Sequence, residues 1–253
     1  MKKIISLVLA MLMVLALAAC TSTEPTNPSV EPTTAPTTEP STAPTEPTEP
    51  TAGVMTHAEF VEADDGTIVT VEFYVQATQS WWDNKITIYG QTAEGGYFAY
   101  ETACTEADAA KLVPGTKIRV TGEKTTWQGE IEIMNGTIEF VEGDSWIAEA
   151  TDVTALLGKD EISVHMNKLV AFKGMTVVAI NYKNGEPGDD IYVTLSKDGV
   201  NYEFCVERYL TGPETEVYKA FAQLNTGDVV DVEGFLYYYA DAINPHIISV
   251  KKA

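Results

Sequence analysis

The sequence predicts an all-β protein with short helices, in which two five-stranded Greek-key barrels follow each other after a disordered stalk. Three observations carry this prediction. Segments of alternating apolar and polar residues, typical of strands with one buried face, fill residues 54–253. A segment with two glycines seven residues apart recurs at residues 112–122 and 224–234, each time after a short helical pattern. The composition, 45% hydrophobic and 21% charged, is that of a globular protein.

Residues 1–20 are expected to be a lipoprotein signal peptide. Two lysines open the chain, and an apolar run interrupted only by Ser6 follows as far as residue 19. A helix of that length covers ~24 Å, less than the ~30 Å hydrocarbon core of a bilayer, which favours a cleaved signal over a membrane span. The run ends in Leu-Ala-Ala-Cys20, which resembles the lipobox of bacterial lipoproteins. Cys20 is therefore the expected site of diacylation (palmitate), and the protein is expected on the extracytoplasmic face of the cell membrane. An ordinary secretory signal whose cleavage site precedes a cysteine is the alternative.

Residues 21–53 are expected to form the stalk. Threonine, proline, glutamate and serine dominate them, and 8 of the 12 prolines lie between Pro25 and Pro50. Proline removes amide donors and favours extended polyproline II, and Val30 alone is suited to a core. At ~3.1 Å per residue the segment would span roughly 100 Å, enough to hold a domain away from the membrane.

The elements expected in residues 54–150 follow the same order as those in residues 151–253. Strands are expected at residues 69–77, 85–89 and 97–103, and again at residues 169–180, 191–195 and 201–207. Helices are expected at residues 105–111, capped by Thr105, and at residues 213–224, with Pro213 in the first turn. Two further strands follow each helix.

Three strands, a helix and two more strands are the order of the OB-fold, a small Greek-key barrel. Val71, Phe73 and Val75 alternate with polar or tyrosine neighbours, as the inner and outer faces of a barrel wall require. Gly122 and Gly234, at the ends of the matched segments, suit the tight bends of such a barrel. The sequence therefore predicts one OB-like domain at residues 54–150 and a second at residues 151–253. A sandwich with inserted helices is the alternative.

Residues 69–133 also resemble the OB-fold-like repeats of cell-surface lipoproteins in Gram-positive, often gut-dwelling, bacteria. The segments that carry this resemblance are Tyr74-Val75-Gln76-Ala77, Ser80-Trp81-Trp82-Asp83-Asn84-Lys85-Ile86-Thr87, Gly96-Tyr97-Phe98 and Leu112-Val113-Pro114-Gly115-Thr116-Lys117-Ile118. The second half keeps the general pattern without the Trp-Trp-Asp-Asn block. The resemblance implies architecture and location only, because the family has no firmly assigned activity.

A ligand is expected at the loops between strands one and two and between strands four and five, which flank the ligand face of OB-folds. In the first domain these loops hold Trp81, Trp82, Asp83, Asn84, Trp127 and Gln128. Aromatic side chains offer apolar area with a polar rim, which suits sugar rings, unstacked bases or the side chains of a partner. The corresponding loops of the second domain hold Tyr182 and residues 237–239. Plugs that close the barrels are the alternative role of these aromatic residues.

Charge argues against nucleic acid as that ligand. The chain has a formal net charge of −21, and residues 54–150 alone carry 5 basic and 17 acidic side chains, a net charge of −12. Each phosphate contact needs local positive charge. The first domain would therefore need its few cations, among them Lys85, Lys117, Arg119 and Lys124, on one face.

The sequence shows no pattern of an enzyme, a metal site or a cofactor site. His57, His165 and His246 lack metal-ligand spacing, and the acidic turns lack the spacing of a calcium loop. Cys104 and Cys205 occupy corresponding positions in separate domains, which predicts two buried free thiols rather than a disulfide. Nucleophile elbows and phosphate loops are absent from the sequence. No enzymatic activity and no cofactor are expected.

Together these features predict a non-enzymatic, lipid-anchored module that binds a glycan or an extracellular protein through its aromatic loops. A structural spacer or assembly subunit of a cell-envelope complex is the first alternative. An accessory OB-fold unit that binds single-stranded nucleic acid is the second.

Overall fold

The computed structural model describes residues 53–253. The predicted signal peptide, the lipidation site Cys20 and the predicted stalk up to residue 52 lie outside the described residues. Among residues 53–253, none of the helices has the length and apolar character needed to cross a bilayer.

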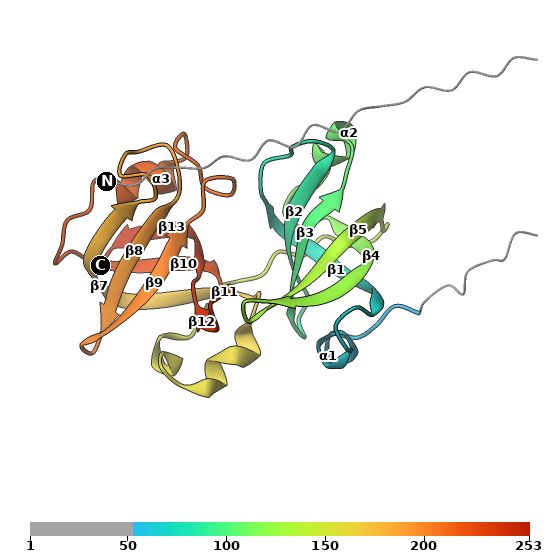
Figure 1. Cartoon of the computed structure of the whole chain (residues 1–253), viewed down its shortest axis with the longest axis horizontal. Helices are drawn as coiled ribbons and strands as arrows, with labels where there is room; N and C mark the ends of the chain where they lie inside the picture. The colour runs from blue at the N-terminus through green and yellow to red at the C-terminus, as the bar shows by residue number, and fades with distance from the viewer. Residues whose placement is uncertain (1–52) are drawn as a thin grey trace, which may run out of the picture. The chain divides into compact units, whose positions relative to one another are not determined.

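The first barrel consists of five strands that close on themselves (Figure 1). The strands are β1 (Ile68–Thr78), β2 (Lys85–Gln91), β3 (Gly96–Ala103), β4 (Lys117–Trp127) and β5 (Glu130–Phe140). Their order is β1-β2-β3-β5-β4, and β4 pairs with β1 to complete the barrel. β3 and β5 run parallel, with Ala99 opposite Ile133. Val71, Phe73 and Val75 are fully buried in the lumen, as the alternation along β1 predicts.

The second barrel has the same topology. Its strands are β7 (Leu169–Tyr182), β8 (Ile191–Lys197), β9 (Val200–Val206), β10 (Val229–Phe235) and β13 (His246–Lys252). They follow the order β7-β8-β9-β13-β10, the pairing of β10 with β7 closes the ring, and β9 runs parallel to β13. The short strand β6 (Thr151–Asp152) adds to β7, and β11 (Tyr238–Tyr239) pairs with β12 (Ala242–Ile243). The prediction of OB-like barrels is confirmed, and the sandwich alternative is wrong.

Short helices lie between the third and fourth strands of both barrels. α2 (Glu106–Ala109) begins after Thr105, whose hydroxyl accepts a hydrogen bond from the amide of Asp108, as predicted. α3 (Glu216–Phe221) begins later than the sequence suggests, because Thr215 and not a residue near 213 caps it. A further helix, α1 (His57–Glu62), precedes the first barrel, and two 3-10 helices, Thr154–Leu156 and Asp160–His165, precede the second. These last elements were not expected from the sequence.

Gly122 and Gly234 occupy equivalent bulges in the fourth strands. The register of β4 with β5 shifts next to Gly122, and that of β10 with β13 shifts at Gly234. A Cβ atom would lie 2.6 Å from the Met134 carbonyl oxygen at the first position and 2.4 Å from the His246 carbonyl oxygen at the second. Glycine is therefore required by the close approach of the fifth strand, which refines the predicted role in bending.

The two barrels pack against each other through a third hydrophobic cluster. Its buried members are Tyr89 and Phe98 of the first barrel, Leu169, Phe235 and Tyr237 of the second, and Ala148 of the connection between them. The Tyr89 ring stacks on Phe235 with 4.5 Å between centroids, and its hydroxyl lies 2.6 Å from Nδ1 of His246. The outer face of β2 and β3 is thus partly covered by the second barrel.

Buried glutamine side chains of the first barrel bind the second barrel and the connection between the two. The Gln91 side chain accepts a hydrogen bond from the amide of Leu169 at 2.7 Å. Gln76, which lies on the outer side of β1, accepts one from the amide of Ala148 at 2.8 Å and is itself buried. Satisfied polar groups of this kind fix one arrangement of the chain.

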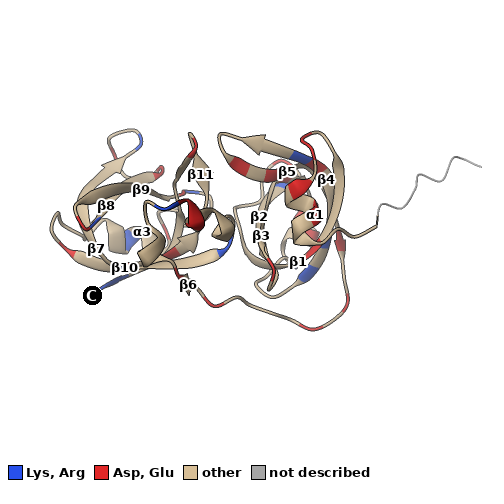
Figure 2. Cartoon of the chain, turned by 90° about the horizontal axis from the view of Figure 1, so that it is seen from below, with Lys and Arg blue, Asp and Glu red and all other residues tan. Residues whose placement is uncertain are grey.

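Every lysine and arginine side chain between residues 54 and 150 forms an ion pair with a carboxylate. The pairs are Lys85–Glu101, Lys111–Asp108, Lys117–Glu72, Arg119–Glu72 and Lys124–Asp65, with nitrogen–oxygen distances of 2.7 to 3.0 Å. Figure 2 shows the basic segments scattered among acidic ones. The first barrel therefore presents no free positive face among its described residues.

Candidate ligand-binding cleft

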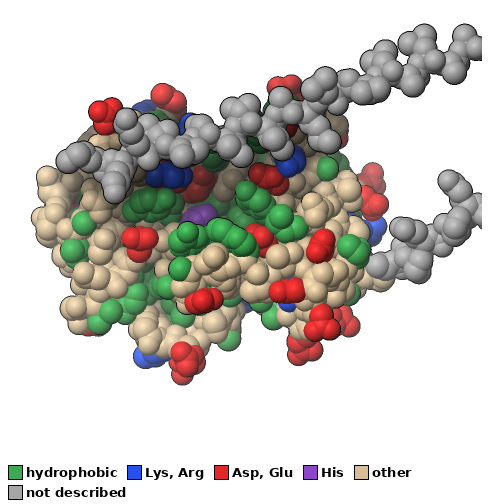
Figure 3. Space-filling view, in the orientation of Figure 1, with side chains coloured by type: hydrophobic (Ala, Val, Ile, Leu, Met, Phe, Trp, Pro, Cys, Tyr) green, Lys and Arg blue, Asp and Glu red, His purple; other side chains and the backbone are tan. Residues whose placement is uncertain are grey.

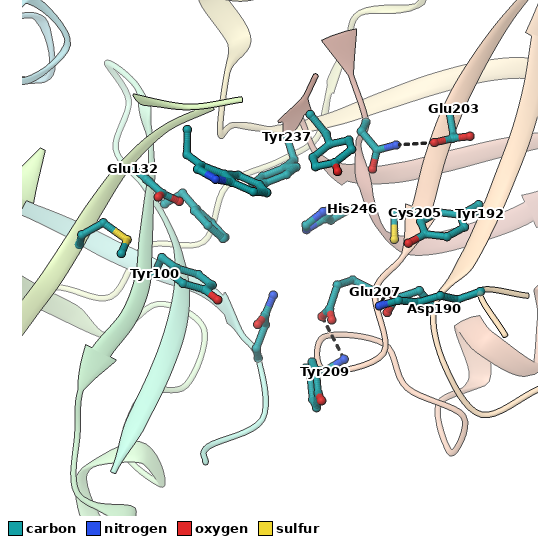
Figure 4. A pocket seen from close by; sticks show the side chains of 17 residues that line it. Tyr100, Glu132, Asp190, Tyr192, Glu203, Cys205, Glu207, Tyr209, Tyr237 and His246 are labelled. Atoms are coloured by element: carbon teal, nitrogen blue, oxygen red, sulfur yellow. Dashed lines mark hydrogen bonds and ion pairs between the residues drawn. The ribbon is translucent and has the colours of Figure 1, made fainter. Parts of the chain in front are cut away.

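A cleft of about 760 Å³ lies between the two barrels, and residues of both line it. The space-filling view shows a hollow bordered by hydrophobic side chains, with charged groups around it and a histidine at its base (Figure 3). In Figure 4, Tyr100 and Glu132 lie on one side of this cleft, and Tyr192, Glu203 and Cys205 lie on the other. A volume of this size falls within the range of small-molecule sites.

The wall contributed by the first barrel comes from the outer faces of β3 and β5. Tyr97 and Ala99 point into the barrel core. Because successive side chains of a strand point to opposite faces, Phe98 and Tyr100 point outward. On β5 the core contains Ile133, which leaves Glu132 and Met134 on the outer face.

The wall contributed by the second barrel comes from the outer faces of β8 and β9. Ile191 and Val193 fill the core, so Tyr192 between them faces the cleft. Its register partner Cys205 and the nearby Glu203 complete this surface. The cleft is thus bounded by the third and fifth strands of the first barrel and by the second and third strands of the second barrel.

Two tight turns bring aromatic residues to one end of the cleft. Gln128 and Gly129 join β4 to β5 with φ of 52° and 90°, the left-handed geometry of a two-residue hairpin. The amide of Asp241, in the β11–β12 turn, donates a hydrogen bond to the Gln128 carbonyl oxygen at 3.0 Å. This contact places Trp127 beside Tyr239, with 5.6 Å between ring centroids.

A second hollow of about 240 Å³ continues the cleft along the first barrel. Gln79, Tyr100 and Tyr209 line both spaces. The smaller one is also lined by Trp82, whose side chain is 68% exposed. Aromatic side chains are therefore available along a continuous path from Trp127 to Trp82.

The six residues predicted to bind a ligand have different places in the structure. Trp127 and Trp82 line the cleft and its continuation. Asp83 and Asn84, with φ of 47° and 59°, form the exposed turn of a tight hairpin, and neither lines the cleft. Gln128 is held in the contact between the two turns.

Trp81 packs against the core of the first barrel. Its ring contacts that cluster, and its Nε1 donates a hydrogen bond to the Cys104 carbonyl oxygen at 2.8 Å. The sequence prediction placed three tryptophans in one patch, and the structure gives Trp81 a separate, structural position.

We expect Trp81→Ala to lower the free energy of unfolding by about 2–3 kcal/mol, because it removes packed aromatic area and leaves a carbonyl without its donor. Trp82→Ala is the matched control and should change it by less than about 0.5 kcal/mol, since its ring is mostly in solvent. Urea unfolding of both variants measures the difference. Equal losses would contradict the structural assignment of Trp81.

Four carboxyl groups line the cleft, and three of them have partners. Asp190 pairs with Lys183 at 2.8 Å, and Glu203 accepts a hydrogen bond from Asn244 at 3.4 Å. Glu207 accepts hydrogen bonds from the backbone amides of Tyr209 and Leu210 at 2.9 and 2.8 Å. Burial raises the pKa of Glu207 to about 7.

Glu132 is the fourth carboxyl group. It is only 5% exposed, and within residues 53–253 its side chain makes no hydrogen bond or ion pair. Burial raises its pKa to about 7.

The histidine at the base of the cleft is His246. Its ring stacks on Tyr237 with 4.2 Å between centroids, and burial lowers its pKa to about 4. It is therefore neutral at pH 7, and the paired Lys183 is the only cationic side chain among the described residues that line the cleft.

The cysteines and histidines form no reactive or metal-binding group. Cys104 and Cys205 are buried and free, as predicted, and burial raises the pKa of both thiols. Among residues 53–253, no group of three or more histidine, cysteine, aspartate or glutamate side chains is placed to hold a metal ion.

Sequence reasoning missed most of the cleft. Tyr100, Glu132, Tyr192, Glu207, Tyr209 and His246 lie on strands or in a loop that the loop-based argument did not consider. The alternating Glu-Ile-Glu-Ile at the start of β5 does signal two acidic side chains on an outer face. Which surface faces them depends on how the barrels pack, and no local pattern encodes that.

No protein-family model and no curated protein sequence matches this chain. The chain is similar to a murine DNA-binding protein bound to double-stranded DNA, at 13% identity over 73% of this chain and 96% of that one, with a TM-score of 0.35. It is similar to the HINb domain of p204 at 14% identity over 76% and 100%, again with a TM-score of 0.35. A replication protein A heterotrimer bound to single-stranded DNA gives 14% identity over 72% and 49%, with a TM-score of 0.30. At these TM-scores the similarities assign neither a family nor a ligand to this chain.

Proposed function

We propose that this protein is a non-enzymatic binding module that holds a glycan in the cleft between its barrels. The aromatic path from Trp127 to Trp82, lined on both sides by hydrogen-bonding groups, is the observation that supports this function. Sugar rings present apolar faces edged by hydroxyl groups, which match aromatic rings flanked by carboxylate and amide oxygens. The proposal keeps the predicted ligand class and moves the site from the loops of one barrel to the cleft.

A second part of the proposal concerns location. We propose that the signal peptide and lipidated Cys20 hold the module on the extracytoplasmic face of the membrane, where glycans are available. The sequence at residues 1–20 supports this part.

Charge disfavours nucleic acid in the same cleft. A phosphate chain would meet Glu132, Glu203 and Glu207, and the one lysine there is already paired with Asp190. OB-folds bind single strands by combining aromatic stacking with a positively charged groove. Among the described residues, the cleft offers the aromatic side chains but no positively charged groove.

Trp127→Ala should lower the affinity for a glycan identified on an array by about tenfold or more, because it removes the aromatic surface at one end of the cleft. Isothermal titration calorimetry measures the affinity. Phe140→Ala is the matched control and should leave it unchanged, since Phe140 is an exposed aromatic residue at the opposite end of the same hairpin.

The same titration with a thymidine oligonucleotide distinguishes the nucleic-acid alternative. We expect no binding at physiological salt. Binding of the oligonucleotide that weakens steeply as salt rises, in the absence of any glycan binding, would replace the proposed function with the nucleic-acid one.

A further inference from the structure

Glu132 is a buried carboxyl group that faces the cleft without a partner in the described chain. Its outward direction follows from the alternation along β5, whose neighbouring residue Ile133 lies in the barrel core. Figure 4 shows its side chain on the wall formed by the first barrel. A largely buried ionisable side chain that reaches a cleft without a protein partner is a position at which a ligand can supply that partner.

The groups around Glu132 offer it no positive charge. The titratable side chains whose pKa values the charge of Glu132 affects are Glu130, Tyr100 and Tyr237, which are acidic or neutral. Glu130 is fully buried and uses one carboxylate oxygen to accept the amide of Tyr238 at 2.8 Å. A neutral ligand could satisfy Glu132 by donating a hydroxyl proton, but a cationic donor forms a stronger bond with a carboxylate.

Aromatic side chains in the same cleft favour a cation for a second reason. Trp127 and Tyr239 lie side by side at its end, and Tyr100 and Tyr237 line its sides. The faces of such rings attract ammonium groups, most strongly where water is excluded. The acidic residues of the opposite wall, Glu203 and Glu207, add to the same field.

We propose that the ligand of this cleft carries a protonated amine, as in an oligosaccharide of amino sugars, and that Glu132 binds the ammonium group. The inference rests on the proposed glycan-binding function and narrows it from glycans in general to amine-bearing ones. Lys183 does not oppose such a ligand, because Asp190 neutralises it.

The test compares two probes with the same sugar backbone: the hexasaccharide of N-acetylglucosamine and its fully de-N-acetylated form, in which ammonium groups replace the neutral acetamido groups. Calorimetric titration of the protein at about pH 6 keeps the amines protonated. We expect the deacetylated probe to bind about tenfold more tightly, and Glu132→Gln to abolish this preference. Glu139→Gln is the matched control, since Glu139 is an exposed residue farther along β5 that pairs with Arg119, and it should keep the preference.

Proton release on binding gives a second readout, which would be absent if Glu132 had only a structural role. Below its raised pKa the free Glu132 carboxyl is protonated, so binding an ammonium ion must release up to one proton per ligand. Titrations in two buffers with different ionisation enthalpies should detect this release in the wild type and not in Glu132→Gln.

The outcomes separate this inference from the function on which it rests. Equal or weaker binding of the deacetylated probe, or a preference that survives Glu132→Gln, overturns the inference. If neutral glycans still bind and Trp127→Ala abolishes that binding, the proposed glycan-binding function remains and only the preference for amines is wrong. If no glycan of any kind binds, both are wrong.

Discussion

Tyr89→Ala should lower the free energy of unfolding by about 3–5 kcal/mol, the largest effect we expect from a single substitution. The Tyr89 ring is 1% exposed and stacks on Phe235, so its removal leaves a cavity in the cluster that joins the barrels. The substitution also removes the hydroxyl partner of the buried His246. Urea unfolding followed by tryptophan fluorescence and circular dichroism measures the loss.

The same experiment shows whether the barrels unfold together. Coupling through the shared cluster predicts one transition for the wild type and two for Tyr89→Ala. Tyr89→Phe is the control: it keeps the ring and removes the hydroxyl, so it should cost only about 1–3 kcal/mol. A Tyr89→Ala variant that unfolds in one transition with a loss below about 1 kcal/mol would show that the cluster does not couple the barrels.

Glu132→Gln should stabilise the protein in a pH-dependent way. The folded state raises the pKa of this carboxyl from the ordinary 4.5 to about 7, so it holds its proton more tightly than the unfolded chain does. The wild type therefore loses stability as pH rises from 4.5 to 7, and a glutamine does not. The advantage of the variant should grow from near zero at about pH 4 to about 3 kcal/mol at about pH 8.

Comparison with the wild type at each pH cancels the effects of other groups. This matters because burial lowers the pKa of His246 to about 4, which acts in the opposite direction: the folded state then loses stability as pH falls below 6.5. Glu139→Gln is the matched control, and it should change the free energy of unfolding by less than about 0.5 kcal/mol, since the Glu139 side chain is 69% exposed. An advantage of Glu132→Gln that stays constant with pH would contradict the raised pKa.

Local sequence patterns predicted the barrels well, for a physical reason. The alternation of Val71, Phe73 and Val75 reflects a wall with one buried face, and Thr105 caps a helix through its own side chain. Both features depend on residues close together in the chain. The start of α3 was predicted too early, because Pro213 fits a first turn but Thr215 supplies the capping oxygen.

The cleft was harder to predict because it depends on distant residues. Trp81 and Trp82 are neighbours in sequence, yet one packs on the core and the other lies in solvent. Glu132 and Tyr192 lie 60 residues apart and line the same space only because the barrels pack through Tyr89 and its neighbours. The position of that packing surface is a property of the folded chain.

Each of the two barrels supplies one wall of a shared cleft, and this sets the number of proposed ligand sites per chain. Although the architecture is repeated, the proposed site is shared by the two barrels, so the proposal predicts one ligand bound per two barrels. Tandem repetition within the chain therefore adds no avidity. Multivalent capture of a polymer would instead depend on how densely copies of the protein are displayed beside one another.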